Sequence, residues 1–166
     1  MTPLSGRFYR IIFEHDLARV LDGVPNPEGR FHHDAQPALY LSPSHKAARV
    51  AIDSYYRSND AARVIVPLKL SGADMLDFRE VATSDRLGLM GGETTVHWRQ
   101  ERRAKKPATS WRASDAARAA GADGMIYRSR KAPPLWHIVL FAWNQKGAPT
   151  LAQDGLPQQF ISEQTP

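Results

Sequence analysis

One run of residues, 137–143, restricts the fold more than any other part of the sequence. It reads His-Ile-Val-Leu-Phe-Ala-Trp and is apolar over almost its whole length, which is typical of a strand in the middle of a sheet. No apolar run in the chain reaches the roughly 18 residues that a membrane span needs. We therefore expect a globular domain built around a β-sheet, with no membrane as partner.

Other segments add strands to this sheet. Aromatic and β-branched residues bounded by turn residues are typical of strands, and they gather in residues 8–13, 38–41, 63–70, 75–78 and 124–127. Pro67 indicates a sheet edge or an irregularity, because proline has no N–H for a strand ladder. Three prolines and two glycines lie within residues 22–37, which predicts an ordered loop there.

Two helices are predicted between these strands. Ser42 and Pro43 have the order of an N-cap and a first helical residue. The helix that follows is expected to reach about residue 57 and to pack on the sheet through one face, formed by Ala47, Ala48, Ala51, Ile52 and Tyr55. A second helix is expected from Ser114 to Ala120, closed by Gly121 in a left-handed conformation.

The chain of 166 residues has the length of one domain. Residues 82–109 give no clear pattern, and no periodicity follows Asn144. We therefore predict one domain over residues 1–144 and an irregular tail over residues 145–166. The expected fold class is α+β, a single compact domain with a mixed β-sheet core flanked by short helices.

Composition limits the chemistry. The chain has no cysteine, which excludes a disulfide framework, a thiolate metal site and a cysteine nucleophile. Residues 1–10 lack the apolar stretch of a signal peptide, so a cytoplasmic location is expected. The formal charge of +5 and the pI of about 9.7 favour an anionic partner, which could be nucleic acid, an acidic protein or a phosphate-bearing small molecule.

Five segments resemble the landmarks of one protein family in order and spacing. They are Phe8-Tyr9-Arg10, Gly29-Arg30-Phe31, Ala38-Leu39-Tyr40-Leu41-Ser42 with its alanine-rich helix, residues 122–130, and Ile138-Val139-Leu140-Phe141. Over residues 7 to 143 the chain resembles the RES family. That resemblance implies a fold similar to ADP-ribosyltransferase toxins, NAD as the substrate, and a cognate Xre-like antitoxin as the partner.

The resemblance also names three candidate site residues. Arg30 matches the family arginine, and a planar guanidinium can hold a pyrophosphate or ribose oxygen with two hydrogen bonds. Tyr40 matches the family tyrosine, whose ring could stack on nicotinamide. Ser129 matches the family serine, whose hydroxyl could donate to the nicotinamide amide. The alternatives are an ion pair between Arg30 and a surface carboxylate such as Glu28, a half-buried strand tyrosine and an ordinary loop serine.

The sequence departs from the family at the glutamate of the alanine-rich helix, where Ala51 stands. A carboxylate there would stabilise the positive charge that develops on the ribose. Asp53 is the nearest acidic residue and a candidate catalytic residue, but it lies about 200 degrees around the helix from Ala51. It could instead pair with Arg49 or Arg57, four residues away on either side. His45 and Glu80 are weaker candidates for the same role.

Histidines supply further candidates. His32 and His33 follow Arg30 directly, and we expect His32 to contact the substrate, with solvent exposure as the alternative. His137 begins the final strand, where it could position Ser129 or belong to the core. No histidines and carboxylates stand at the spacing of metal ligands, so no metal is predicted.

A basic segment supports a rival hypothesis of another class. It contains Arg99, Arg102, Arg103, Lys105 and Lys106, with Trp98 and Trp111 nearby. Cations among aromatic residues can bind nucleic acid, but a solvated face or the docking site of an acidic protein is the commoner role. Direct nucleic-acid binding is therefore not expected, and a non-catalytic binding module stays open as an alternative.

The predicted function is a toxin of a bacterial toxin–antitoxin system that consumes NAD. A site without its carboxylate is poorly suited to activating water, which favours ADP-ribosyl transfer to a cellular protein that supplies its own nucleophile. Family members include modifiers of nucleotide-synthesis enzymes, so such an enzyme is a possible acceptor. The alternative is a glycohydrolase or phosphorylase that depletes NAD.

Overall fold

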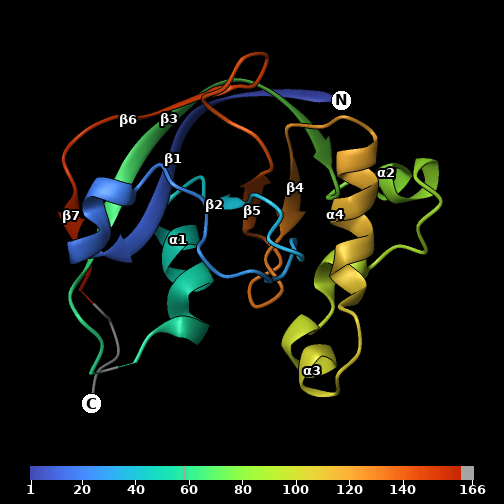
Figure 1. Ribbon diagram of the computed structural model, residues 1–166, viewed down its shortest axis with the longest axis horizontal. Helices are drawn as coiled ribbons and strands as arrows, with labels where there is room; N and C mark the ends of the chain where they lie inside the picture. Colours follow the sequence, from blue (N-terminus) through green and yellow to red (C-terminus); the bar gives the residue numbers. More distant parts are fainter. Residues whose placement is uncertain (58, 162–166) are drawn as a thin grey trace.

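A mixed seven-stranded β-sheet runs through the centre of the computed structural model, which describes residues 1–57 and 59–161 (Figure 1). Its strand order is β1-β3-β4-β5-β2, and β6 and β7 also pair with β3. The strands are β1 (Thr2–Phe13), β2 (Leu39–Leu41), β3 (Arg63–Asp77), β4 (Gly124–Arg128), β5 (Trp136–Leu140), β6 (Thr150–Gln153) and β7 (Gln158–Gln159). β3 and β4 are parallel and the other pairs antiparallel. The predicted α+β class is confirmed.

The longest strand, β3, replaces the two strands predicted over residues 63–70 and 75–78. β1 pairs along its length on one side, while β7, β6 and β4 pair in turn on the other. Pro67 lies between the segment paired with β7 and the segment paired with β6, so it marks an irregularity and not an edge. Gly72 has a left-handed φ of 73°, which interrupts the sequence pattern without ending the strand.

The first long helix, α1 (His45–Ile52), begins later than predicted. Ser44 is its N-cap, and the Ser44 hydroxyl accepts the N–H of Ala47 (3.1 Å). Ser42 is held instead by backbone hydrogen bonds to Tyr9 on β1. The predicted packed face is only partly right, because Ala47 and Ala48 are buried whereas Ala51 is exposed. A short helix, η2 (Asp53–Tyr55), follows α1 and leaves Tyr55 exposed.

The last helix, α4 (Thr109–Ala119), begins five residues before the predicted Ser114 cap. Its first turn is capped by a side chain from another helix, α3 (Trp98–Arg103): the carboxylate of Glu101 accepts the backbone N–H of Thr109 (2.8 Å). Ser114 is buried inside the helix. Gly121 ends it with a φ of 75°, as predicted. The unassigned region 82–109 also contains α2 (Val81–Arg86) and η3 (Glu93–Thr95).

The predicted irregular tail is wrong for residues 150–159, which add β6 and β7 to the sheet. Leu151 is 2% exposed and belongs to the core. The Asn144 side chain closes the connection by donating to the carbonyl of Leu151 (2.8 Å) and accepting its N–H (2.7 Å). One buried position in four residues gives no periodic signal, which explains the error. Residues 162–166 of the predicted tail lie outside the described residues.

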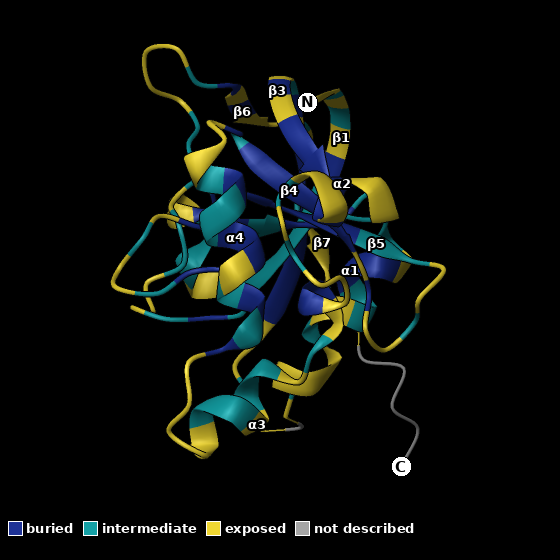
Figure 2. Cartoon of the chain, turned by 90° about the vertical axis from the view of Figure 1, so that its right-hand side faces the viewer, coloured by how far each residue is buried: buried dark blue, intermediate teal, exposed yellow. Residues whose placement is uncertain are grey.

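Two apolar clusters hold the sheet. One contains residues of β1 to β6, among them Phe8 and Leu151. The other lies between the sheet and α4 and includes Phe31, Ala113 and Tyr127. Figure 2 shows β3 buried over most of its length, whereas α2 is exposed apart from its buried residues Thr83 and Ser84. Among the described residues, no helix is long and apolar enough to cross a membrane.

Candidate active site

Arg30 lies in a tight turn that α4 holds against the sheet. The turn is closed by the backbone N–H of Gly29, which donates to the carbonyl of His32 (2.8 Å). From α4, the Ser110 hydroxyl donates to the carbonyl of Arg30, and the Trp111 indole N–H donates to the carbonyl of Gly29 (2.8 Å). Only glycine fits at position 29, because a Cβ there would lie 2.2 Å from His32 Cε1. The turn is therefore built to place one arginine.

The Arg30 guanidinium is a cation without a carboxylate. Its Cζ lies 5.0 Å from the ring centre of Phe31 and 5.2 Å from that of Tyr127. Nη2 donates to the carbonyl of Thr94, while Nε is buried without a hydrogen-bond partner. No carboxylate among residues 1–57 and 59–161 forms an ion pair with Arg30. Burial lowers the Arg30 pKa, and a desolvated cation with a free donor is poised to bind an anion.

The alternative partner suggested for Arg30 is already engaged. Glu28 forms a two-point ion pair with Arg102 of α3 (3.1 and 3.0 Å). The interpretation of Arg30 as half of a surface ion pair with Glu28 is therefore wrong.

Tyr40, on β2, uses its hydroxyl to hold the Arg30 turn. The hydroxyl accepts the backbone N–H of Phe31 (3.0 Å) and lies 2.9 Å from Nδ1 of His32. The other ring nitrogen of His32, Nε2, faces the carbonyl of Asn26 (3.1 Å). All of these hydrogen bonds form when His32 is neutral with its proton on Nε2. Nε2 then donates to the Asn26 carbonyl, and the Tyr40 hydroxyl donates to Nδ1. Burial lowers the pKa of His32 and raises that of Tyr40, which keeps both neutral.

His32 is buried inside the loop, so the alternative of a solvent-exposed His32 is wrong, while its contact with substrate stays a prediction. Its side chain is 2% exposed and both ring nitrogens are engaged inside the loop. Through its contact with the Tyr40 hydroxyl, His32 supports the turn that carries Arg30. His33 is also engaged: Nε2 lies 3.0 Å from Asp115 on α4 and Nδ1 lies 2.7 Å from Asp34.

Ser129 and His137 lie on neighbouring chain segments beside Tyr127. Tyr127 on β4 pairs with His137 on β5, and their ring centres are 5.6 Å apart. The Ser129 hydroxyl, just after β4, accepts the N–H of Ala132 (3.2 Å) and keeps its own proton for donation. His137 Nδ1 lies 2.9 Å from the Ser42 hydroxyl. Burial, with a contribution from the charge of Arg30, lowers the pKa of His137 to about 4.

Tyr127 is the site residue that sequence reasoning missed. It belongs to the segment 122–130 that carries the resemblance, but only the register between β4 and β5 places it between Arg30 and His137. Its ring packs on Phe31 with 4.5 Å between the ring centres. Its position two residues before Ser129, in the same family-like segment, is the signal that could have identified it.

Asp53 lies at the start of η2, apart from the position of the missing glutamate. Its carboxylate contacts Lys131 Nζ, from the loop between β4 and β5, and its side chain is 51% exposed. The suggested partner Arg49 instead donates to the carbonyl of Ile161 (2.5 Å), and the observed ion pair of Asp53 is with Lys131. Ala51 is exposed.

The other weak candidates lie at different places. The His45 ring packs on Tyr9 of β1, with 4.4 Å between ring centres. Glu80 is exposed at the N-cap position of α2. Among the described residues, no three histidine or carboxylate side chains are grouped to hold a metal ion.

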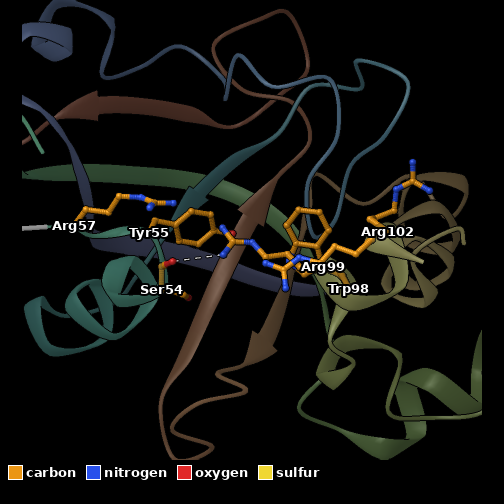
Figure 3. A pocket seen from close by; sticks show the side chains of 7 residues that line it. Ser54, Tyr55, Arg57, Trp98, Arg99 and Arg102 are labelled. Atoms are coloured by element: carbon orange, nitrogen blue, oxygen red, sulfur yellow. Dashed lines mark hydrogen bonds between the residues drawn. The ribbon is translucent and has the colours of Figure 1, made fainter. Parts of the chain in front are cut away.

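A cavity of about 520 Å³ lies between η2 and α3 (Figure 3). Ser54, Tyr55 and Arg57 line one side, and Trp98, Arg99, Arg102 and Arg103 line the other. The predicted basic segment therefore contributes to a cavity. Trp111 does not line it, because Trp111 stacks on His33 (4.7 Å between ring centres) beneath the Arg30 turn.

The structure is an α+β domain in which a desolvated arginine that forms no ion pair among the described residues lies beside two tyrosines. A cavity lined by arginines is the second feature of the domain. The RES domain family model matches residues 7–160, and the chain belongs to the RES domain family. The match includes most of the segment predicted as a tail, which agrees with the pairing of β6 and β7.

One solved structure shows the same fold. In the crystal structure of the M. tuberculosis MbcT-MbcA toxin-antitoxin complex, one chain matches 95% of this chain over 85% of its own length, with a TM-score of 0.64 and 17% sequence identity. Comparison with curated proteins gave no match. The predicted RES resemblance is confirmed.

Proposed function

We propose that this protein is a toxin of a toxin–antitoxin system that binds NAD through Arg30 and consumes it. The observation that carries the proposal is the Arg30 guanidinium, which is desolvated, has an unpartnered Nε and forms no ion pair within the described residues. A buried cation is costly unless an anion completes it. The pyrophosphate of NAD supplies that anion, and Arg30 can grip two of its oxygens.

The surrounding residues fit the nicotinamide half of the same molecule. Tyr127 and Tyr40 offer aromatic surface beside Arg30, and the Ser129 hydroxyl retains a proton for the nicotinamide amide. His137 is neutral near pH 7 because its pKa is lowered to about 4. Its Nδ1 is engaged with Ser42, so Nε2 is the nitrogen left for substrate. His32 then acts as a positioning residue through Tyr40 and the Arg30 turn.

The reaction breaks the bond between nicotinamide and C1′ of the ribose. Nicotinamide leaves with the bonding electron pair, and positive charge develops on the sugar. The nucleophilic atom of an acceptor then bonds to C1′ and gives up its proton. Arg30 fixes the pyrophosphate so that C1′ is held in place, which lowers the entropic cost of the attack.

We propose ADP-ribosyl transfer to a cellular protein, such as an enzyme of nucleotide synthesis, as the favoured reaction. Position 51 has no carboxylate, and the Asp53 carboxylate is neutralised by Lys131. Neither group is suited to activating water, whereas a protein acceptor brings its own nucleophile and contacts. Hydrolysis or phosphorolysis of NAD is the alternative, with Asp53 as the catalytic carboxylate once Lys131 moves away.

We further propose an Xre-like antitoxin as the partner and the cytoplasm as the site of action. The solved relative with the same fold was crystallised as a toxin–antitoxin complex. The positive charge of this chain suits an acidic partner surface.

The test incubates purified protein with NAD labelled on the adenylate half, with and without bacterial lysate. A discrete labelled lysate protein establishes transfer, and free ADP-ribose or its phosphate ester without lysate establishes degradation. Arg30→Ala should abolish either product, and Arg112→Ala, an exposed arginine on α4, is the matched control. If wild-type protein gives neither product, the catalytic proposal is wrong.

A further inference from the structure

The cavity between η2 and α3 contains more positive charge than its own carboxylates balance. Four arginines line it, and only Arg102 has an ion-pair partner, Glu28. In the described part of the chain, no carboxylate forms an ion pair with Arg57, Arg99 or Arg103. Guanidinium groups gathered without counter-charge repel one another, and an anion bound among them relieves that repulsion.

Arg99 is held in place before any ligand binds. Its Cζ lies 3.9 Å from the ring centre of Tyr55 and 5.8 Å from that of Trp98, and Nη1 donates to the carbonyl of Ser54 (3.4 Å). Figure 3 shows this arginine reaching from α3 to the Tyr55 side of the cavity. Cation–π contact restricts the side chain and leaves in-plane N–H donors free. The cavity therefore has a preorganised donor for a phosphate.

Arg102 joins this cavity to the Arg30 turn. It lines the cavity, and its guanidinium holds Glu28, two residues before Arg30, through two hydrogen bonds (3.1 and 3.0 Å). Arg30 itself donates to the carbonyl of Thr94, four residues before the cavity residue Trp98. A ligand anchored at Arg30 can therefore extend towards the cavity. The nicotinamide half faces Ser129 in the proposed pose, so the adenosine half is the part that extends.

We propose that the cavity binds a phosphate monoester on the adenosine ribose, so that NADP is a substrate and binds more tightly than NAD. This inference rests on the proposed function at Arg30. A phosphate monoester adds about 1.5 to 2 negative charges to a dinucleotide. Arginines beside the adenosine ribose are the usual means by which proteins accept a 2′-phosphate. Arg99 and Arg103 supply its donors, and Trp98 supplies aromatic surface for the base.

The test measures binding of NAD, NADP, 2′,5′-ADP and 5′-ADP to the full chain by isothermal titration calorimetry. NADP should bind at least tenfold more tightly than NAD, and 2′,5′-ADP more tightly than 5′-ADP. In Arg99→Ala and Arg103→Ala, each preference should fall about tenfold or more, as expected for the loss of a charge-assisted hydrogen bond. Arg112→Ala should keep both preferences.

Equal affinities for NAD and NADP in wild-type protein would overturn the proposal. The proposal is also overturned if Arg99→Ala and Arg103→Ala keep the preference for NADP over NAD. It is overturned as well if these substitutions weaken only the binding of an acidic protein partner or of nucleic acid. The failure of the proposed function has a different signature. If neither dinucleotide binds but 2′,5′-ADP binds through Arg99, the phosphate site in the cavity is supported and the proposal of NAD consumption is wrong.

Discussion

Replacing Tyr40 with phenylalanine tests whether this tyrosine holds the Arg30 turn. The substitution removes one oxygen and leaves two polar groups without partners: the backbone N–H of Phe31 and Nδ1 of His32. Both belong to residues that are at most 2% exposed. An unsatisfied buried group costs about 1 to 3 kcal/mol, so the free energy of unfolding should fall by about 2 to 4 kcal/mol if water satisfies one group in part.

Urea denaturation followed by tryptophan fluorescence measures this change. Trp111 lies directly under the turn, because its indole N–H donates to Gly29. Tyr56→Phe is the matched control, since the Tyr56 hydroxyl makes no hydrogen bond among the described residues and its ring only packs near Phe160. It should change the free energy of unfolding by less than about 0.5 kcal/mol. A Tyr40→Phe protein as stable as the control would refute the role of the hydroxyl in the turn.

Three further predictions concern stability. Burial opposes the protonation of His33, but its hydrogen bonds to Asp34 and Asp115 outweigh that effect and raise its pKa. The contribution of His33 to the free energy of unfolding is therefore full below pH 6.5 and is lost as pH rises through the raised pKa. Asp115→Asn should flatten that part of a stability–pH curve. Burial lowers the His137 pKa to about 4, so the stability of the wild-type protein should fall as pH drops from 6.5 towards 4. His137→Asn should reduce the slope of stability against pH in this range, and an unchanged slope in the variant would contradict this prediction. Leu151→Ala should cost about 2 to 4 kcal/mol in thermal or urea unfolding, because Leu151 is 2% exposed; a negligible cost would mean that β6 is not part of the core.

The sequence predicted the strand segments well because their signals are local. Residues 8–13 and 124–127 carry aromatic and β-branched residues and lie in strands, as do residues 39–41 of the predicted segment 38–41. The start of α4 was missed because its cap, Glu101, lies eight residues upstream on another helix. β6 was missed because its single buried residue, Leu151, is stabilised by pairing with β3, a long-range contact that leaves no local pattern.

The candidate site was only partly predictable for the same reason. Arg30, Tyr40 and Ser129 were identified through the order of family-like segments, which is a linear signal. Two of the site's contacts depend on how the loop that carries Arg30 packs against β2 and β4. They are the hydrogen bond from the Phe31 N–H to the Tyr40 hydroxyl and the contact between Arg30 and Tyr127. The ion pair of Asp53 with Lys131 joins η2 to a loop 78 residues later in the chain, which helix spacing around Asp53 could not reveal.

The most direct test of NAD consumption through Arg30 measures nicotinamide release from NAD by purified wild-type, Arg30→Ala and Arg112→Ala proteins, each with the acceptor-containing lysate. Circular dichroism first establishes that all three are folded. We predict that wild-type and Arg112→Ala proteins release nicotinamide at similar rates and that Arg30→Ala is at least about 100-fold slower, as the loss of a two-point charged contact implies. Equal release by the wild-type and Arg30→Ala proteins would contradict the proposed role of Arg30.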